Sequence, residues 1–100
     1  MSIEDITNRI KEKMTRAAGL QAKVKFDFGD DGLVYVDTTQ NPPEISHENK
    51  EAETTLSCSL DTFKGFLDGT QDPNIAFMMG KLKVQGSMGL AMKLNAILED

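Results

Sequence analysis

The stretch of sequence that decides the fold runs from Phe77 to Leu98 and reads FMMGKLKVQGSMGLAMKLNAIL. It holds four of the six methionines of the chain and no acidic residue. Its second half has the spacing of a helix, with apolar residues on two separate sides. One apolar side can cover a protein core, whereas the other needs a second apolar partner: a ligand, a subunit or a membrane.

The two sides of this expected helix differ in chemistry. At about 100° per residue, one broad aliphatic face consists of Leu90, Ala91, Leu94, Ile97 and Leu98. The other face consists of Met88, Met92 and Ala96. Methionine is unbranched and adaptable, so a surface of methionines can fit varied apolar shapes. The pattern alone favours packing of both faces into the core, because a helix between a sheet and other helices needs no ligand.

Composition and charge narrow the function classes. One hundred residues predict a single domain over residues 1–100. A net charge of −5 argues against nucleic-acid binding and against steady adhesion to anionic membranes. The single cysteine, Cys58, excludes an intrachain disulfide and is compatible with a reducing cytosol. The chain shows neither a signal-peptide pattern nor an apolar run of about 20 residues, so we expect a cytoplasmic protein.

Periodicity along the rest of the chain predicts the order of its elements. A helical stripe at residues 3–17 is followed by alternating strands at 24–28 and 33–38, which the turn sequence Asp30-Asp31-Gly32 joins as a hairpin. Further strands are predicted at 44–48, 54–58 and 82–84, and further helices at 60–67, 73–79 and 88–98. This order predicts an α+β fold, with a five-stranded, mainly antiparallel sheet covered by helices.

No group of residues has the pattern of a catalytic or metal site. His47 is the only histidine and lies among polar residues, so we interpret it as a surface residue. Cys58 falls on the apolar side of a predicted strand without a basic neighbour, which indicates a buried, unreactive thiol. Nothing supplies a nucleophile, a base and an orienting group together. We therefore predict a protein that is not an enzyme and that uses no metal and no cofactor.

Residues 76–94, AFMMGKLKVQGSMGLAMKL, resemble the sterol carrier protein 2 (SCP2) family of lipid-binding domains. The pattern of that family is an A-F-M-x-G-K-L-K-[IV]-x-G-N/S-M-x-x-A-x-K-L run. The remaining elements agree with the family in order and spacing, including the loop from Gly69 to Asp72-Pro73. The resemblance covers essentially the whole chain, although the last quarter alone carries the diagnostic sequence.

The resemblance implies a hydrophobic cavity between the helices and the sheet. It also implies non-catalytic binding, and intermembrane transfer, of lipids such as fatty acids, fatty acyl-CoA, sterol-like or phospholipid ligands. By motif position, the residues expected to line the cavity are Phe77, Met78, Leu82, Val84, Met88, Leu90 and Met92. The order of elements adds Phe63 and Phe66. With this resemblance, a lipid ligand replaces the core as the expected partner of the methionine face.

Two points about partners stay open from the sequence. A polar lipid head group could lie near Lys81, Lys83 or Lys93, and transient contact with a membrane fits a transfer function. As an alternative, the second apolar face could cover another protein, either a second copy of the chain or an enzyme partner. The protein would then be a dimerisation module or an accessory subunit of a lipid-metabolising enzyme.

Overall fold

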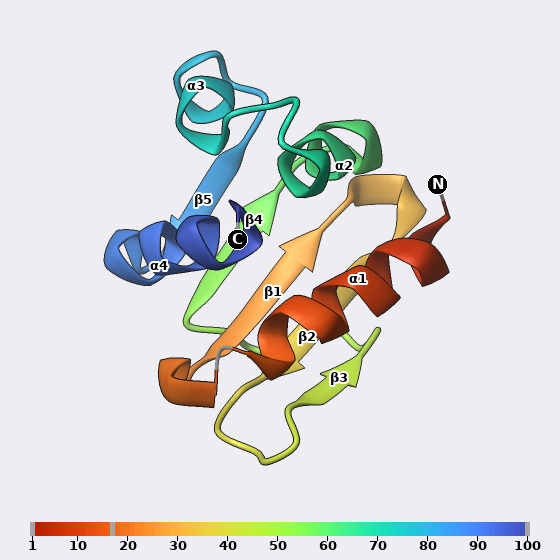
Figure 1. The fold of residues 1–100 in the computed structure, drawn as a ribbon, viewed down its shortest axis with the longest axis vertical. Coiled ribbons are helices and arrows are strands. Elements are labelled where there is room, and N and C mark those ends of the chain that lie inside the picture. The colour runs from red at the N-terminus through yellow and green to blue at the C-terminus, as the bar shows by residue number, and fades with distance from the viewer. Residues whose placement is uncertain (1, 17, 100) are drawn as a thin grey trace.

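The computed structural model describes residues 2–16 and 18–99, which form a mixed sheet with helices on one face (Figure 1). The helices are α1 (Ile3–Thr15), α2 (Leu60–Asp68), α3 (Pro73–Met78) and α4 (Met88–Glu99), with short 3₁₀ turns η1 (Ala18–Leu20) and η2 (Gly29–Asp31). The strands are β1 (Lys23–Asp27), β2 (Leu33–Asp37), β3 (Glu44–Ser46), β4 (Thr54–Ser57) and β5 (Lys83–Gly86). Ala17, which the sequence placed on the first helix, lies outside the described residues.

The sheet has the strand order β3-β2-β1-β4-β5. β1 and β2 pair in antiparallel fashion from Lys23 opposite Asp37 to Asp27 opposite Leu33, which confirms the predicted hairpin. β1 and β4 pair in parallel, whereas β2 with β3 and β4 with β5 are antiparallel. The prediction of an α+β fold with a five-stranded, mainly antiparallel sheet is therefore confirmed, and the central pairing is its parallel exception.

The core lies between the sheet and the layer formed by α1, α2 and α4, which contact one another. Alternate residues of the strands face this layer, since side chains of a strand point to opposite faces. Phe63 of α2 lies at the centre, with its ring centroid 5.4 Å from that of Phe26, 5.2 Å from Phe28 and 6.1 Å from Phe66. Edge-to-face aromatic contacts of this kind add to the stabilisation from buried apolar area.

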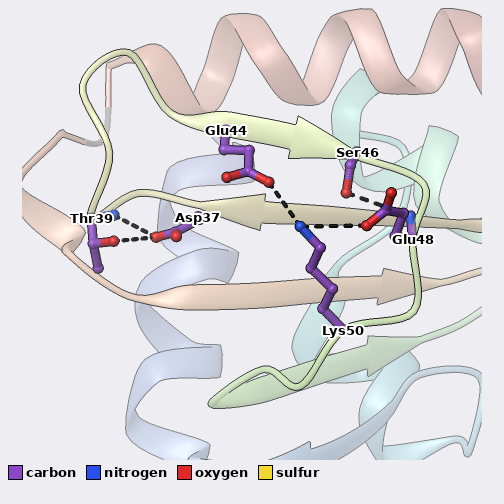
Figure 2. A network of polar contacts seen from close by, with 6 residues as sticks. All are labelled: Asp37, Thr39, Glu44, Ser46, Glu48 and Lys50. Atoms are coloured by element: carbon purple, nitrogen blue, oxygen red, sulfur yellow. Dashed lines mark hydrogen bonds and ion pairs between the residues drawn. The ribbon is translucent and has the colours of Figure 1, made fainter.

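Polar contacts hold the segments on either side of β3 (Figure 2). The Asp37 carboxylate accepts hydrogen bonds from the backbone N–H of Thr39, at 2.9 Å, and from the Thr39 hydroxyl, and the hydroxyl contact is the main cause that lowers the pKa of Asp37. Lys50 Nζ lies 3.0 Å from Glu44 and 3.5 Å from Glu48. These exposed ion pairs close the loop from β3 to β4 and read as structural contacts of small energy.

A tight turn at Gly86 and Ser87 sets the direction of α4. Gly86 has a φ of 94°, a conformation that L side chains rarely adopt, and a Cβ there would collide with the Glu53 carbonyl oxygen. The backbone N–H of Ser87 donates to that same carbonyl at 3.0 Å. The Ser87 hydroxyl accepts from the N–H of Leu90 at 3.2 Å and caps the helix. The turn therefore fixes α4 over β4 and β5.

We expect Gly86→Ala to lower the free energy of unfolding by about 2 kcal/mol or more, because both the backbone conformation and the clash oppose a Cβ. Gly89→Ala is the matched control, since a Cβ at Gly89 meets nothing within 4 Å. This control should stabilise α4 by about 0.5 kcal/mol through helix propensity. Urea denaturation followed by circular dichroism measures both, and equal effects would contradict the turn described here.

Candidate functional site

The short helix α3 turns an apolar face to solvent. It begins at Asp72, whose carboxylate accepts hydrogen bonds from the N–H groups of Asn74, at 2.7 Å, and Ile75, at 3.3 Å. Pro73 and Ala76 form the buried side of this helix. Ile75, Met78 and Met79 follow the spacing of one helix face and are 54%, 84% and 65% exposed. Apolar side chains usually lie on the buried face of a helix, whereas these three are exposed to solvent.

The methionine face of α4 is exposed as well. Ala91, Leu94 and Leu98 of the aliphatic face are buried in the core, and Leu90 and Ile97 are half-buried. Met88 and Met92 on the other face are 48% and 65% exposed. Packing of both faces into the core, which the pattern alone favoured, is therefore wrong. The aliphatic face suffices to cover β4 and β5, and in the described part of the chain no element packs over the methionines.

These side chains belong to one region of the chain. The exposed large hydrophobic residues of the described structure all come from α3, the residue that follows it, and α4; we call them the apolar surface, and they are Ile75, Phe77, Met78, Met79, Met88 and Met92. β5 connects the two helices along the edge of the sheet (Figure 1). On β5, Val84 lies opposite Leu56 and stays half-buried beside the core. A connected apolar region of this kind suits an apolar partner.

The nine residues predicted to bind a ligand divide by exposure. The exposed ones are Phe77, Met78, Met88 and Met92. The half-buried ones are Val84 and Leu90, and the buried ones are Leu82, Phe63 and Phe66. The structure thus places six of them on β5, α4 and the end of α3 around the apolar surface, and packs the other three into the core behind it. Their role in ligand binding stays a prediction.

Sequence reasoning missed a cleft that lies between α4 and the segment at the end of α1. This cleft has a volume of about 420 Å³ and is lined by Arg16, Gly19, Leu20, Lys93, Ala96 and Ile97. It combines two cationic side chains with apolar ones, and Ala96 links it to the methionine face. The sequence predicts that Lys93 and Ile97 lie on a helix, but no pattern around them indicates that the end of α1 lies beside that helix. A second cleft of about 350 Å³ lies between α2 and α3, next to Phe66 and Ile75.

Cys58 and His47, the two remaining side chains that could be reactive, do not form part of a catalytic or metal site in the described residues. Burial raises the pKa of the Cys58 thiol to about 12. His47 Nε2 lies 3.0 Å from the Thr7 hydroxyl at the surface. Among residues 2–16 and 18–99, no group of three histidine, cysteine or acidic side chains is placed to hold a metal ion. Within the same residues, no helix combines the length and apolar character needed to cross a membrane.

The raised pKa of Cys58 predicts a slow thiol. Relative to its ordinary value of 9.0, a pKa of about 12 lowers the thiolate fraction at pH 8 by about 1,000-fold. Labelling by a chromogenic disulfide reagent at pH 8 should therefore be slow in the native protein and fast in urea, with Cys58→Ser as the blank. Rapid labelling of the native protein would show that the thiol is accessible and reactive.

The mixed sheet, the single helical layer and the exposed apolar surface together define a small binding domain for apolar partners. The chain belongs to the SCP-2 sterol transfer family, whose match covers residues 3–99. This membership supports lipid binding or lipid transfer as the general function. Domains of this family are generally non-catalytic.

Known proteins share both sequence and fold with this chain. Hydroxysteroid dehydrogenase-like protein 2 from Bos taurus is 28% identical over 103 residues, covering 97% of this chain and 25% of the relative. The structure of sterol carrier protein 2 from Yarrowia lipolytica, in its apo form, has a TM-score of 0.67 and 26% identity, covering 95% of this chain and 77% of that one. Sterol carrier protein 2 like 2 from Aedes aegypti has a TM-score of 0.74, 20% identity and coverage of 96% and 95%, which shows the shared fold. The chain spans about a quarter of the length of the curated dehydrogenase-like relative.

Proposed function

We propose that the protein is a non-catalytic domain that binds and transfers lipids with one long acyl chain and an anionic head group. Fatty acids and fatty acyl-CoA are the natural members of this class. The observation that carries the proposal is the exposure of the methionine face of α4, with Met88 and Met92 at 48% and 65%, beside the half-buried Val84 and Leu90. Such a face is costly to leave in water and suits an apolar ligand.

The acyl chain would cover the methionine face and the half-buried residues next to it. Each buried methylene contributes about 0.8 kcal/mol, so a long chain contributes on the order of 10 kcal/mol before costs. Association and the ordering of flexible side chains offset several kcal/mol of that gain, which leaves roughly micromolar affinity. Methionine suits this role because it repacks around ligands of different length.

The cleft beside α4 supports an anionic head group. Arg16 and Lys93 approach it from different elements, and in the described residues neither has an ion-pair partner. Among the residues that the structure describes, the lining of the cleft contains no acidic side chain. A carboxylate or phosphate there would gain charge-assisted hydrogen bonds. Because Ala96 belongs to both the cleft and the methionine face, one amphiphile can reach both.

We expect Met88→Glu and Met92→Glu each to weaken binding of a fluorescent fatty acid at least about tenfold, because the new carboxylate must lose water against the acyl chain. Both side chains are exposed, so the free energy of unfolding should change by less than about 0.5 kcal/mol. Asn8→Glu adds the same charge at an exposed position of α1 and is the control.

Fluorescence titration and urea denaturation give these two quantities. The absence of saturable binding to the wild-type protein, and of lipid in native mass spectra, would refute the proposed function. Unfolding of both glutamate variants would instead place these methionines in the core. A sterol or a phospholipid that competes better than a fatty acid would change the ligand class and leave the binding function in place.

A second function, that of an accessory or dimerisation domain of a lipid-metabolising enzyme, is supported by the length of the relatives. The matched dehydrogenase-like relative is about four times as long as the region it shares with this chain. For this alternative, light scattering on the lipid-free protein should detect a dimer whose population rises with concentration. The lipid-carrier proposal predicts a monomer of 11.0 kDa instead.

A further inference from the structure

α3 lies at one end of the molecule and exposes apolar side chains there (Figure 1). α3 lies at one end of the long axis, which is vertical in Figure 1 and measures 34 Å. Gly80, with a φ of 79°, turns the chain from α3 toward β5. Five exposed side chains surround this turn; we call them the α3 tip, and they are Ile75, Met78, Met79, Lys81 and Lys83. Met78, at 84% exposure, is far too exposed to act as a core residue.

The charge around the α3 tip is opposite to that of the rest of the chain. Residues 73–98 contain three lysines and no acidic residue, so the remaining residues hold 8 of the 11 basic and all 16 acidic side chains. Lys81 and Lys83 form no ion pair with any described residue. The nearest acidic residue in sequence, Asp72, caps α3, and its carboxylate accepts a hydrogen bond from the N–H of Ile75 at 3.3 Å, so one acidic group lies beside the two lysines in the sequence of the tip. A net charge of −5 therefore conceals a cationic, apolar stretch of sequence.

We propose that the α3 tip docks on the surface of an anionic lipid bilayer. Ile75, Met78 and Met79 enter the boundary between head groups and acyl chains, and Lys81 and Lys83 contact the head groups. A bilayer requires apolar side chains at a shallow depth with cations beside them, which is the arrangement seen here. Each lysine near an anionic membrane strengthens binding about fivefold. The inference extends the transfer part of the proposed function, because a carrier must meet a membrane to exchange lipid.

The proposal divides the apolar surface into two parts. Met88 and Met92 on α4 bind the ligand, whereas Ile75 on α3 and Met79 just after it, which are not among the nine predicted ligand-binding residues, contact the membrane. Phe77, at 44% exposure, belongs to α3 and is one of the residues predicted to bind the ligand. Docking by α3 would therefore bring the ligand-binding residues of β5 and α4 close to the bilayer. Because the residues differ, docking and ligand binding can be tested separately.

The experiment is flotation of the full chain with vesicles of phosphatidylcholine alone or of phosphatidylcholine and phosphatidylglycerol in equal parts. We expect the wild-type protein to bind the anionic vesicles, and binding to weaken as salt is added. Lys81→Gln with Lys83→Gln should weaken binding by about 25-fold, the product of two fivefold effects. Ile75→Ser with Met79→Ser should weaken it at least about tenfold.

The matched control is Lys11→Gln with Lys64→Gln, which removes the same charge at exposed positions of α1 and α2. It should bind anionic vesicles within about twofold of the wild-type protein. Absence of wild-type binding to anionic vesicles, equal loss in both lysine pairs, or full binding by the serine variant would overturn the proposal. A dimer that the serine substitutions dissociate, without vesicle binding, would assign the tip to a second copy of the chain.

A fatty-acid titration without vesicles separates this inference from the proposed function. The serine variant at Ile75 and Met79, which are not among the nine residues predicted to bind a ligand, should bind the fluorescent fatty acid within about twofold of the wild-type protein. If vesicle docking is present and fatty-acid binding is absent in the wild-type protein, the proposed ligand is wrong and the docking surface stands. If fatty acid binds and vesicles do not, the docking surface is wrong and ligand binding stands.

Discussion

The parallel pairing of β1 with β4 is the constraint on which the rest of the structure depends. It makes β4 end beside the end of β1, where the N–H of Cys58 donates to the carbonyl of Asp27 at 3.1 Å. α2 and α3 follow at that end of the sheet, and β5 can pair only with the free side of β4. β5 thus becomes an edge strand, and α4 returns over β4 and β5 as their cover in the described structure. The most apolar part of the sequence is therefore placed at a sheet edge, where one side of it meets solvent.

The stability of the fold rests on side chains other than the exposed methionines of α4. The contacts of Phe63 with Phe26 and Phe28 join α2 to the sheet, and the buried Leu94 and Leu98 join α4 to it. Burial of such side chains contributes about 1.5–3 kcal/mol each, which is large against the marginal stability of a small domain. Met88 and Met92 take no part in this core. Their substitution therefore changes the surface offered to a partner while the fold keeps its support.

The sequence predicted what depends on local pattern and missed what depends on pairing between distant segments. Alternation around Val24 and Phe26, with the Asp30-Asp31-Gly32 turn, was enough to predict the hairpin of β1 and β2. The parallel partner of β1 was not predictable, because nothing in residues 54–57 shows which strand they will meet. The two faces of α4 followed from periodicity, but their exposure did not, since a buried helix and a partner-binding helix share one pattern. The cleft at Arg16 and Lys93 needed the end of α1 to lie against α4, which only the tertiary structure provides.

The proposed docking of the α3 tip is compatible with a net charge of −5, because net charge averages over the whole molecule. A bilayer surface meets only the side chains within about one Debye length, roughly 8–10 Å at physiological salt, and the molecule is 34 Å long. At the α3 tip it would meet Lys81 and Lys83, with Asp72 as the nearest acidic residue in the sequence. The remaining acidic groups still disfavour broad adhesion of the other faces to anionic lipid. Attraction at the α3 tip and repulsion elsewhere would give docking that is oriented and reversible, and the proposed carrier function needs reversibility because a carrier must leave the membrane with its ligand.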